Sequence, residues 1–440
     1  MAVATDSATE IDPRLVLQAL EITPATALRE EISIPGSKSY TNRAVFIAAL
    51  ADGDTELEHA LMSEDTQLAA GAVQRYGQVE VSLDPAGERM AFHPTGASMV
   101  APADEIVMGN AGTPIRILTA YASLGRGTSR ITGNSRMQER PIQDLIDGLQ
   151  QLGVPARTVR GNGCPPVEVI GARLKGGTAR IRGSVSSQFT TAILLSAPYA
   201  EDAVEIEITD DLTSKPYVDM TLQIMREFGV QTEREGYRRF RVGAGQRYRG
   251  QPYRIEPDAS NMSYFLAAAA ISGGRIRVPG IGRRSVQGDL RFLQVLEQMG
   301  CSSRAEEDSV ELLGGRLRGI DVDMNWMPDL VPTLAAVAAF ADGRTRITNI
   351  GNLRIKECDR IAAMEAELAK VGVRAESTKD TLTVHGGKPL GAQIETYNDH
   401  RIAMSFAIIG LFTPHMVIRN PGCVSKSCPT FWQLLDGLRS

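Results

Sequence analysis

Small apolar residues return at a regular interval along the chain, each time behind a polar or glycine-bearing start. The first such segment reads SKSYTNRAVFIAAL, and five later segments repeat its pattern of apolar residues at helical spacing. The six segments begin at Ser37, Gly112, Ser187, Asp258, Asp329 and Asp399. Successive starts are 75, 75, 71, 71 and 70 residues apart. This regularity predicts six copies of one structural unit, each opening with a helix.

The remainder of each unit is predicted to contain strands and a second helix. Stretches such as TSRITG and TRITNI alternate β-branched and polar residues, a pattern typical of a half-buried strand. The second helices end at glycines, which can take the left-handed conformation that terminates a helix. These glycines are Gly77, Gly153, Gly229, Gly300 and Gly372. One unit is therefore predicted as strand, helix, strand, helix, strand, strand.

Six such units predict an α/β protein with two domains of three units each. The chain has 440 residues, more than one hydrophobic core usually organises. Each unit covers its own sheet only partly, so units should pack together in groups. The alternative is a pair of unrelated α/β domains with similar local patterns, which the regular steps disfavour.

Composition excludes several classes of function. The 47 basic and 52 acidic residues give a net charge of -5, and aromatics make up 5% of the chain, which disfavours a nucleic-acid groove. No stretch approaches the roughly 18 apolar residues of a membrane span, and the first residues lack the apolar core of a signal peptide. The five cysteines and five histidines show no metal-ligand spacing. We therefore expect a cytoplasmic protein with reduced thiols and no metal, membrane or nucleic-acid partner.

The candidate chemistry lies at the helix starts. A helix N-terminus has unpaired N–H groups and about half a positive charge, so it attracts anions. Cations gather near these starts, namely Lys38, Arg43, Arg116, Arg140, Lys356, Arg360, Arg401 and Lys426. Taken singly, Ser37 or Ser39 can simply cap a helix, and Lys356, Glu357 and Arg360 can form exposed helix pairs. Only the whole set predicts a pocket for two phosphorylated or carboxylated molecules.

Ten motifs, in order over more than 400 residues, resemble those of the 5-enolpyruvylshikimate-3-phosphate synthase family. They are PGSKSYTNRA, GNAGT, RMQERPI, SSQFTTA, SKPYVDMT, DASNMSYFLAAAAI, MPDLVPTLA, NLRIKECDR, YNDHR and GCVSKS. The resemblance implies an inside-out α/β barrel of three units in each domain, with the active site in the cleft between them. It also implies that residues 1–36 hold an N-terminal extension and a strand that joins the C-terminal domain. The domains then comprise residues 37–255 and 256–440, and the role of residues 1–21 stays open.

The resemblance implies transfer of the enolpyruvyl group of phosphoenolpyruvate to the 5-hydroxyl of shikimate 3-phosphate, with release of phosphate. This is the 3-phosphoshikimate 1-carboxyvinyltransferase step of aromatic amino-acid biosynthesis, and it needs neither a metal nor an organic cofactor. A hydroxyl loses a proton as it attacks C2, while the methylene carbon gains one. The tetrahedral intermediate then expels phosphate with these proton movements reversed. Two acid–base groups are needed, with cations on the phosphates, and we expect a monomer that closes around its ligands.

The same resemblance assigns roles to particular residues. Asp329 takes the hydroxyl proton, Glu357 serves the methylene carbon, and Lys38 and His400 complete the catalytic set. Shikimate 3-phosphate is expected on Lys38, Ser39, Arg43, Ser186, Ser187, Ser214, Tyr217, Asp329, Asn352 and Lys356. Phosphoenolpyruvate is expected on Lys38, Asn110, Gly112, Arg140, Gln188, Arg360, Arg401 and Lys426, where paired guanidinium groups suit a carboxylate and a phosphate.

A carboxylate ringed by Lys38 and Lys356 should have a lowered pKa and be a weak base, so positioning must carry much of the catalysis. We therefore hypothesise that Lys38 shares the proton transfer.

The chain departs from the family pattern directly after GNAGT. Where the family usually continues Ala-Met-Arg-Pro, this chain has PIRI, with Pro114, Ile115 and Ile117. Proline at 114 lies in the first helical turn, where its missing N–H does little harm. Ile117 replaces the usual proline beneath Gly112, at a site that in this family also admits glyphosate. We predict lowered glyphosate sensitivity, with neutral drift in helix packing as the alternative.

Three other functions are alternatives to this one. The UDP-N-acetylglucosamine enolpyruvyl transferase resembles this family but carries a reactive cysteine in a glycine-rich loop, and none of the five cysteines has that setting. Loss of Lys38, Asp329 or Glu357 would have indicated a non-catalytic binding protein, and all three are present. A structural scaffold would not need cations at so many helix starts.

Overall fold

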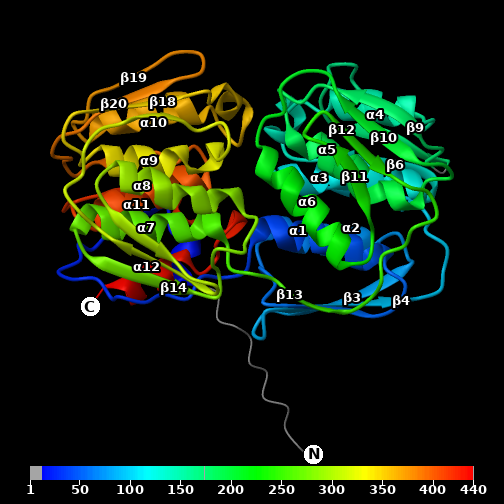
Figure 1. Ribbon diagram of the computed structural model, residues 1–440, viewed down its shortest axis with the longest axis horizontal. Coiled ribbons are helices and arrows are strands. Elements are labelled where there is room, and N and C mark those ends of the chain that lie inside the picture. The colour runs from blue at the N-terminus through cyan, green and yellow to red at the C-terminus, as the bar shows by residue number, and fades with distance from the viewer. Residues whose placement is uncertain (1–11, 173, 440) are drawn as a thin grey trace, which may run out of the picture.

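The computed structural model describes residues 12–172 and 174–439, which form two lobes side by side (Figure 1). These residues form six separate sheets, one for each predicted unit.

The predicted order of elements is confirmed in full for the second, third and fifth units. The second unit contains β5 (Ile106–Val107), α3 (Gly112–Tyr121), β6 (Arg126–Thr132), α4 (Gln143–Gln151), β7 (Ala156–Thr158) and β8 (Val167–Ala172). The third contains β9 (Gly177–Ile181), α5 (Ser187–Ser196), β10 (Val204–Ile208), α6 (Lys215–Glu227), β11 (Thr232–Glu235) and β12 (Arg239–Val242). The fifth contains β17 (Asp321–Asp323), α9 (Val331–Ala338), β18 (Arg344–Thr348), α10 (Arg360–Lys370), β19 (Ala375–Ser377) and β20 (Leu382–His385).

The other three units lack one or two of the predicted strands, and each pairs with a segment from elsewhere in the chain. The first contains α1 (Lys38–Leu50), β2 (Thr55–Glu58), α2 (Glu64–Gln74), β3 (Val79–Asp84) and β4 (Arg89–Pro94), and β13 (Pro252–Arg254) completes its sheet. The fourth contains α7 (Ala259–Ser272), β14 (Arg275–Pro279), α8 (Phe292–Gln298), β15 (Ser302–Ala305) and β16 (Ser309–Leu313), with Glu31 bridged to Arg277. The sixth contains β21 (Gln393–Ile394), α11 (His400–Gly410), β22 (Val417–Arg419) and α12 (Phe431–Leu438), and β1 (Ala19–Glu21) pairs with β22.

The four-stranded sheets share one topology. In each, the first two strands of the unit are parallel, and the fourth strand lies antiparallel between the second and the third. The five glycines predicted to end the second helices all have positive φ, between 75° and 112°. Shared topology and shared helix ends confirm that the sequence periodicity reflects a structural repeat.

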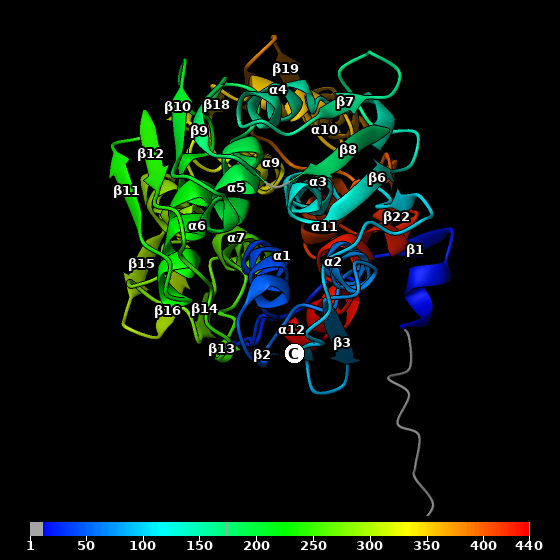
Figure 2. The ribbon, with the colours of Figure 1, turned by 90° about the vertical axis from the view of Figure 1, so that its right-hand side faces the viewer.

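The first helix of each unit lies at the centre of its lobe, with the strands outside. Figure 2 shows α1, α3 and α5 surrounded by strands of the first lobe. Their small apolar side chains explain this position, because a helix that is apolar on all sides has no face to present to water. In α7 the run from Tyr264 to Ala270 is entirely buried. The first helices of both lobes extend toward the space between the lobes (Figure 1).

Two separate hydrophobic cores support the predicted domain limits. One gathers buried residues between 40 and 255, and the other gathers residues 22–34 with residues 259–438. The chain crosses between them on two adjacent segments, where Ser37 N donates to Glu256 O at 2.9 Å and Asp258 N to Pro35 O at 2.9 Å. On this basis we propose residues 37–255 and 256–440 as the two domains.

The described part of the N-terminal extension belongs to the second lobe. Residues Pro13–Val16 form a short 3-10 helix, from which Arg14 Nη1 donates to Trp432 O at 3.2 Å. The pairing of β1 with β22 places the predicted N-terminal strand in the same lobe. Residues 12–21, for which the sequence predicts no role, therefore help to complete the sixth unit, whereas residues 1–11 lie outside the described part of the chain.

Candidate active site

Three of the six predicted helix starts cap their helices, but Asp329 is not a cap. Ser37, Asp258 and Asp399 cap α1, α7 and α11 through their side-chain oxygens. Asp329 instead lies in a 3-10 turn (Pro328–Leu330) before α9 begins at Val331, with Pro332 at a position that needs no N–H donor. Its carboxylate is therefore free of capping contacts and available to the cleft.

One cavity between the lobes collects the predicted site residues. It is lined by Lys38, Ser39, Arg43, Gly112, Arg140, Ser186, Ser187, Gln188, Ser214, Tyr217, Asp329, Asn352, Lys356, Glu357, Arg360, His400 and Arg401. Asn110 and Lys426 are not part of its lining and stand directly behind it. Lys426 Nζ lies 2.7 Å from both Asp65 Oδ1 and Asn110 O, and Asn110 Oδ1 accepts from Arg140 at 3.1 Å. The structure thus brings all the predicted residues together.

The lobes touch around this cavity. Asn352 Nδ2 donates to Thr213 Oγ1 at 3.1 Å, and Arg136 Nη2 donates to Lys356 O at 2.9 Å. The cavity volume is about 60 Å³, well below the roughly 300–1,000 Å³ of typical ligand sites. Two small anions therefore need the lobes to move apart before they can enter.

Asp329 is surrounded by cations of its own lobe. Its Oδ1 lies 3.0 Å from Arg360 Nη1 and 3.6 Å from Lys356 Nζ, and its Oδ2 lies 3.1 Å from Arg401 Nη2. Burial pushes the pKa of Asp329 upward, but Lys356, Arg401 and Arg360 together hold it well below its usual range. The predicted lowering is confirmed, although the two arginines, and not Lys38, accompany Lys356.

Glu357 occupies a similar electrostatic position. Arg360 Nη2 lies 2.8 Å from its Oε2, while Arg140 Nη1 and Lys426 Nζ each lie 3.9 Å from its Oε1. Burial raises the pKa of Glu357, and these three cations outweigh it and bring the pKa well below the usual range. Arg360 is only 2% exposed and also pairs with Asp399 at 2.7 Å, so one guanidinium links three carboxylates.

Asp65 is a site residue that the sequence does not reveal. It is 3% exposed at the start of α2, and its carboxylate lies 2.7 Å from Lys426 Nζ and 3.6 Å from Lys38 Nζ. Burial lowers the pKa of Lys38, and Asp65 opposes that effect. In the sequence Asp65 has the ordinary appearance of an acid in the first turn of a helix, where the helix dipole favours it.

Asp65→Asn is expected to destabilise the unliganded protein by about 3 kcal/mol, because two buried ammonium groups lose their shared carboxylate. Chemical denaturation of the protein without ligands measures this change. Asp54→Asn is the matched control, since Asp54 is 74% exposed and its contact with His93 is worth little. Equal stability of the two variants would show that Asp65 does not hold the lysines.

Arg43 is a buried cation without a carboxylate partner among the described residues. It is 1% exposed, and its guanidinium donates to Thr221 Oγ1 at 2.9 Å, Ser39 O at 2.8 Å and Tyr217 O at 2.9 Å. Burial lowers its pKa to about 10. A buried charge with only neutral partners is unfavourable, and an anionic group placed in the cavity would relieve it.

Gly112 and Arg116 have structural reasons for their positions. A Cβ atom on Gly112 would lie 2.6 Å from Arg140 Nη2, so only glycine lets that guanidinium rest on the start of α3. Arg116 Nη1 donates to Gly112 O and to Gln188 Oε1, each at 2.9 Å. Arg116, one of the candidate cations of the sequence, is thus a support behind the cavity and not part of its lining.

His400 lines the cavity as a neutral imidazole. Burial and the nearby charges of Lys38 and Arg401 bring its pKa well below 6.5. Neither ring nitrogen has a hydrogen-bond partner among the described residues, and Asp399 Oδ1 lies 3.7 Å from Nδ1. A neutral ring in this place can exchange a hydrogen bond with a ligand without adding charge.

Acid should destabilise the unliganded protein through His400. Below about pH 6.5 the unfolded imidazole binds a proton that the folded one does not, so the free energy of unfolding falls by up to about 1.4 kcal/mol per pH unit. We expect His400→Gln to flatten this decline between about pH 7 and pH 5, where carboxylates of ordinary pKa remain ionised. Denaturant titrations across this range measure both slopes, and identical slopes would contradict the assignment.

The fold and site define a two-lobed protein whose repeated helices begin at one shared cavity. Cations line that cavity around two ionised carboxylates, Asp329 and Glu357. A family model for EPSP synthase (3-phosphoshikimate 1-carboxyvinyltransferase) matches residues 22–435. The chain belongs to this family, and it is a transferase. None of its described helices is both long and apolar enough to cross a membrane.

Known relatives match the chain over nearly its whole length. It is 42% identical over 426 residues to the 3-phosphoshikimate 1-carboxyvinyltransferase of Sulfurovum sp., covering 96% of this chain and 100% of that protein. It is 43% identical over 422 residues to the protein of the same name from Shewanella amazonensis, covering 95% and 98%. A solved EPSP synthase from Acinetobacter baumannii superposes with a TM-score of 0.80 at 28% identity, covering 96% of this chain and 98% of that one.

Proposed function

We propose that this chain transfers the enolpyruvyl group of phosphoenolpyruvate to the 5-hydroxyl of shikimate 3-phosphate and releases phosphate. The observation that carries this proposal is the pair of carboxylates, Asp329 and Glu357, held ionised by buried cations within one interlobe cavity. Two ionised carboxylates can each accept a proton in turn, and the cations can hold two anionic substrates beside them.

The two substrates are proposed to bind in different parts of the cavity, one against the first lobe and the other between the two lobes. Shikimate 3-phosphate faces the first lobe, where the uncompensated Arg43 lies near the starts of α1, α5 and α6. Phosphoenolpyruvate lies between Arg140 of the first lobe and Arg360 and Arg401 of the second. Lys38, at the start of α1, lies between the two sets, and Lys356 faces the acceptor beside Asp329.

The lowered pKa values support one assignment of the proton transfers. Asp329 is an ionised base for the acceptor hydroxyl as its oxygen attacks C2, and its low pKa makes placement more important than basicity. Ionised Glu357 is ready for the second step, in which the methyl carbon loses a proton as the bond to phosphate breaks. In the first step the methylene carbon needs a proton donor. Lys38 is the proposed donor, an ammonium whose pKa is lowered by burial and raised in part by the charge of Glu357.

Each chain contains both walls of the cavity, so a monomer can carry out the reaction, and we propose a monomer. The described cysteines, Cys164, Cys301, Cys358, Cys423 and Cys428, are all free thiols. Free thiols fit a reducing compartment, and we propose a cytoplasmic location.

Phosphate release from phosphoenolpyruvate tests the proposal directly. The purified protein is given phosphoenolpyruvate with shikimate 3-phosphate in one reaction and with UDP-N-acetylglucosamine in another. We expect phosphate only in the first reaction. Release only with the nucleotide sugar would assign the rival transferase activity, and no release in either reaction would favour a binding protein.

Glyphosate is expected to inhibit this chain weakly, and Ile117→Pro to strengthen inhibition by about tenfold, which is about 1.4 kcal/mol of binding free energy. Ile117 is fully buried in α3, whose first residue, Gly112, touches Arg140. A proline at 117 removes one helical hydrogen bond and so alters the first turn of α3. Inhibition constants measured against phosphoenolpyruvate for both proteins test this. Inhibition of the unaltered chain as tight as in sensitive family members would contradict it.

A further inference from the structure

Trp326 lies across the boundary between the lobes, outside the substrate cavity. On its own lobe, Arg291 stacks over the indole with Cζ 4.1 Å from the ring centroid. From the first lobe, Lys215 Nζ lies 5.7 Å from the same centroid, and the Tyr237 ring meets it edge to face at 6.2 Å and 87°. None of these four residues lines the cavity that holds Asp329. We call these four residues the Trp326 cluster.

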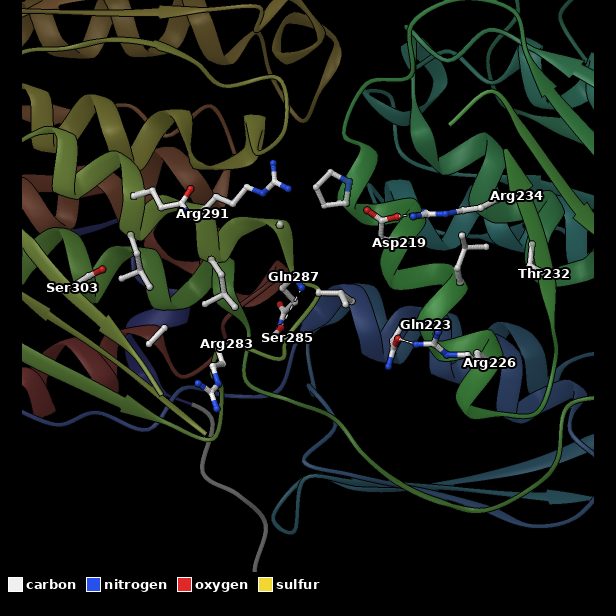
Figure 3. A pocket seen from close by; sticks show the side chains of 18 of the residues that line it. Asp219, Gln223, Arg226, Thr232, Arg234, Arg283, Ser285, Gln287, Arg291 and Ser303 are labelled. Carbon is white, nitrogen blue, oxygen red and sulfur yellow. Dashed lines mark hydrogen bonds and ion pairs between the residues drawn. The ribbon is translucent and has the colours of Figure 1, made fainter. Parts of the chain in front are cut away.

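The first-lobe half of the Trp326 cluster is fixed by its own contacts. Tyr237 Oη donates to Asp219 Oδ2 at 2.6 Å, and Arg234 Nη1 pairs with Asp219 Oδ1 at 2.5 Å. Lys215 Nζ lies 5.7 Å from the Tyr237 centroid and 3.7 Å from Asp211 Oδ1. A groove of about 860 Å³ lies beside these residues. Figure 3 shows Asp219 and Arg234 on one side of it and Arg291 reaching toward them from the other. Hydrogen bonds and ion pairs therefore hold the first-lobe half of the Trp326 cluster in place at the edge of an open groove.

The first turn of α6 contacts both ends of the segment from Trp326 to Asp329. Lys215 contacts Trp326, and two residues later the Tyr217 hydroxyl donates to Asp329 Oδ2 at 3.4 Å. Between them Pro216 touches the second lobe, since a Cβ atom on Gly288 would lie 2.3 Å from Pro216 Cβ. No spacer separates the lobes at this point.

Ser214, the residue before this turn, holds a left-handed backbone with φ of 53°. A residue other than glycine keeps this conformation only where its surroundings enforce it, and such residues gather at functional sites. Ser214 also lines the substrate cavity. The same turn thus joins an expected substrate contact to the contacts that hold Trp326 and Asp329.

We propose that Trp326 is a positioning residue for the transfer reaction. Its contacts with Lys215, Tyr237 and Arg291 hold residues 326–329 against the first turn of α6, so that Asp329 faces the acceptor hydroxyl when the lobes are closed. This inference rests on the proposed function for the identity of the acceptor. Because Trp326 acts through Asp329 and touches neither substrate site, its loss should lower kcat and leave the KM for phosphoenolpyruvate unchanged.

Steady-state kinetics of three variants test the proposal. Trp326→Ala is expected to lower kcat about tenfold, and Trp326→Phe, which keeps an aromatic face for both cations, to restore most of it. Trp432→Phe is the matched control, because Trp432 is buried in the core of the second lobe, away from the cleft. A kcat for Trp326→Ala equal to that of the unaltered protein, or an equal loss in Trp326→Phe, would overturn the positioning role.

Fluorescence gives a readout that a general loss of stability does not produce. Trp326 and Trp432 are the two tryptophans of the chain, and acrylamide quenching distinguishes a half-buried indole from a buried one. Shikimate 3-phosphate should protect Trp326 from quenching as the lobes close, and this protection should disappear in Trp326→Phe while Trp432 still emits. Protection that persists in Trp326→Phe would overturn the proposal. If the unaltered protein releases no phosphate, the proposed function is refuted instead. The quenching result would still show whether Trp326 becomes buried against the first lobe.

Discussion

Lys38→Met is expected to lower kcat about a thousandfold, the scale on which positioned acid–base groups act, while the protein remains folded. Methionine keeps an unbranched chain but has neither charge nor proton. The backbone contact at this position survives, because Lys38 N, not the side chain, donates to Asp258 Oδ2 at 2.8 Å. Turnover with both substrates, together with a denaturation midpoint, measures the two quantities separately. Near-normal turnover would refute any role of Lys38 in proton transfer.

Two further variants help to separate the loss of a positive charge from the loss of a proton donor. Lys38→Arg keeps the charge but holds its protons far more tightly, so it should retain substrate binding and still turn over slowly. Lys388→Met is the surface control, since Lys388 is exposed and does not line the cavity. A full loss in Lys38→Met with normal turnover in Lys38→Arg would assign Lys38 an electrostatic role only.

The repeat, the helix ends and the cations could be predicted because each leaves a local signal. A helix that is buried on all sides must be apolar throughout, and a helix that ends in a left-handed turn favours glycine. Gly77 and Gly372, near opposite ends of the chain, both follow this rule. No local signal places the borrowed strands, because short strands pair through backbone groups that carry no residue-specific signal. The family resemblance places β1 with the second lobe, whereas β13 has no such guide.

The site was predictable in its residue types but not in its pairings. The sequence predicts Arg360 as a contact of phosphoenolpyruvate, and the structure shows its guanidinium bridging Asp329, Glu357 and Asp399. Asp65 cannot be recognised from the sequence, because an acidic residue in the first turn of a helix is common. Trp326 sits beside a recognisable motif, and nothing in the sequence indicates which face of the first lobe it meets. These features depend on how two lobes come together, which local patterns do not encode.

Glu357→Gln and Asp329→Asn are each expected to lower kcat by about two to four orders of magnitude, for different reasons. If Lys38 protonates the methylene carbon and ionised Glu357 later removes a proton from the methyl group, Glu357→Gln completes the addition and stalls before elimination. The tetrahedral intermediate, a covalent adduct formed from the two substrates, should then accumulate in the active site, at one equivalent per enzyme. In deuterated water its methyl group should carry deuterium. Rapid quench followed by NMR or mass spectrometry detects it.

With Asp329→Asn no adduct should accumulate, because no base is left to accept the proton of the acceptor hydroxyl. The two amides are comparable as variants: both carboxylates are ionised, both contact Arg360, and each substitution removes one negative charge from the same group of cations. A difference in adduct between them therefore reports the step at which each residue acts, and not a shared loss of electrostatic balance. Adduct in Asp329→Asn and none in Glu357→Gln would exchange their roles. Adduct in neither would mean that addition needs both carboxylates, and would leave Lys38 without an independent part as proton donor.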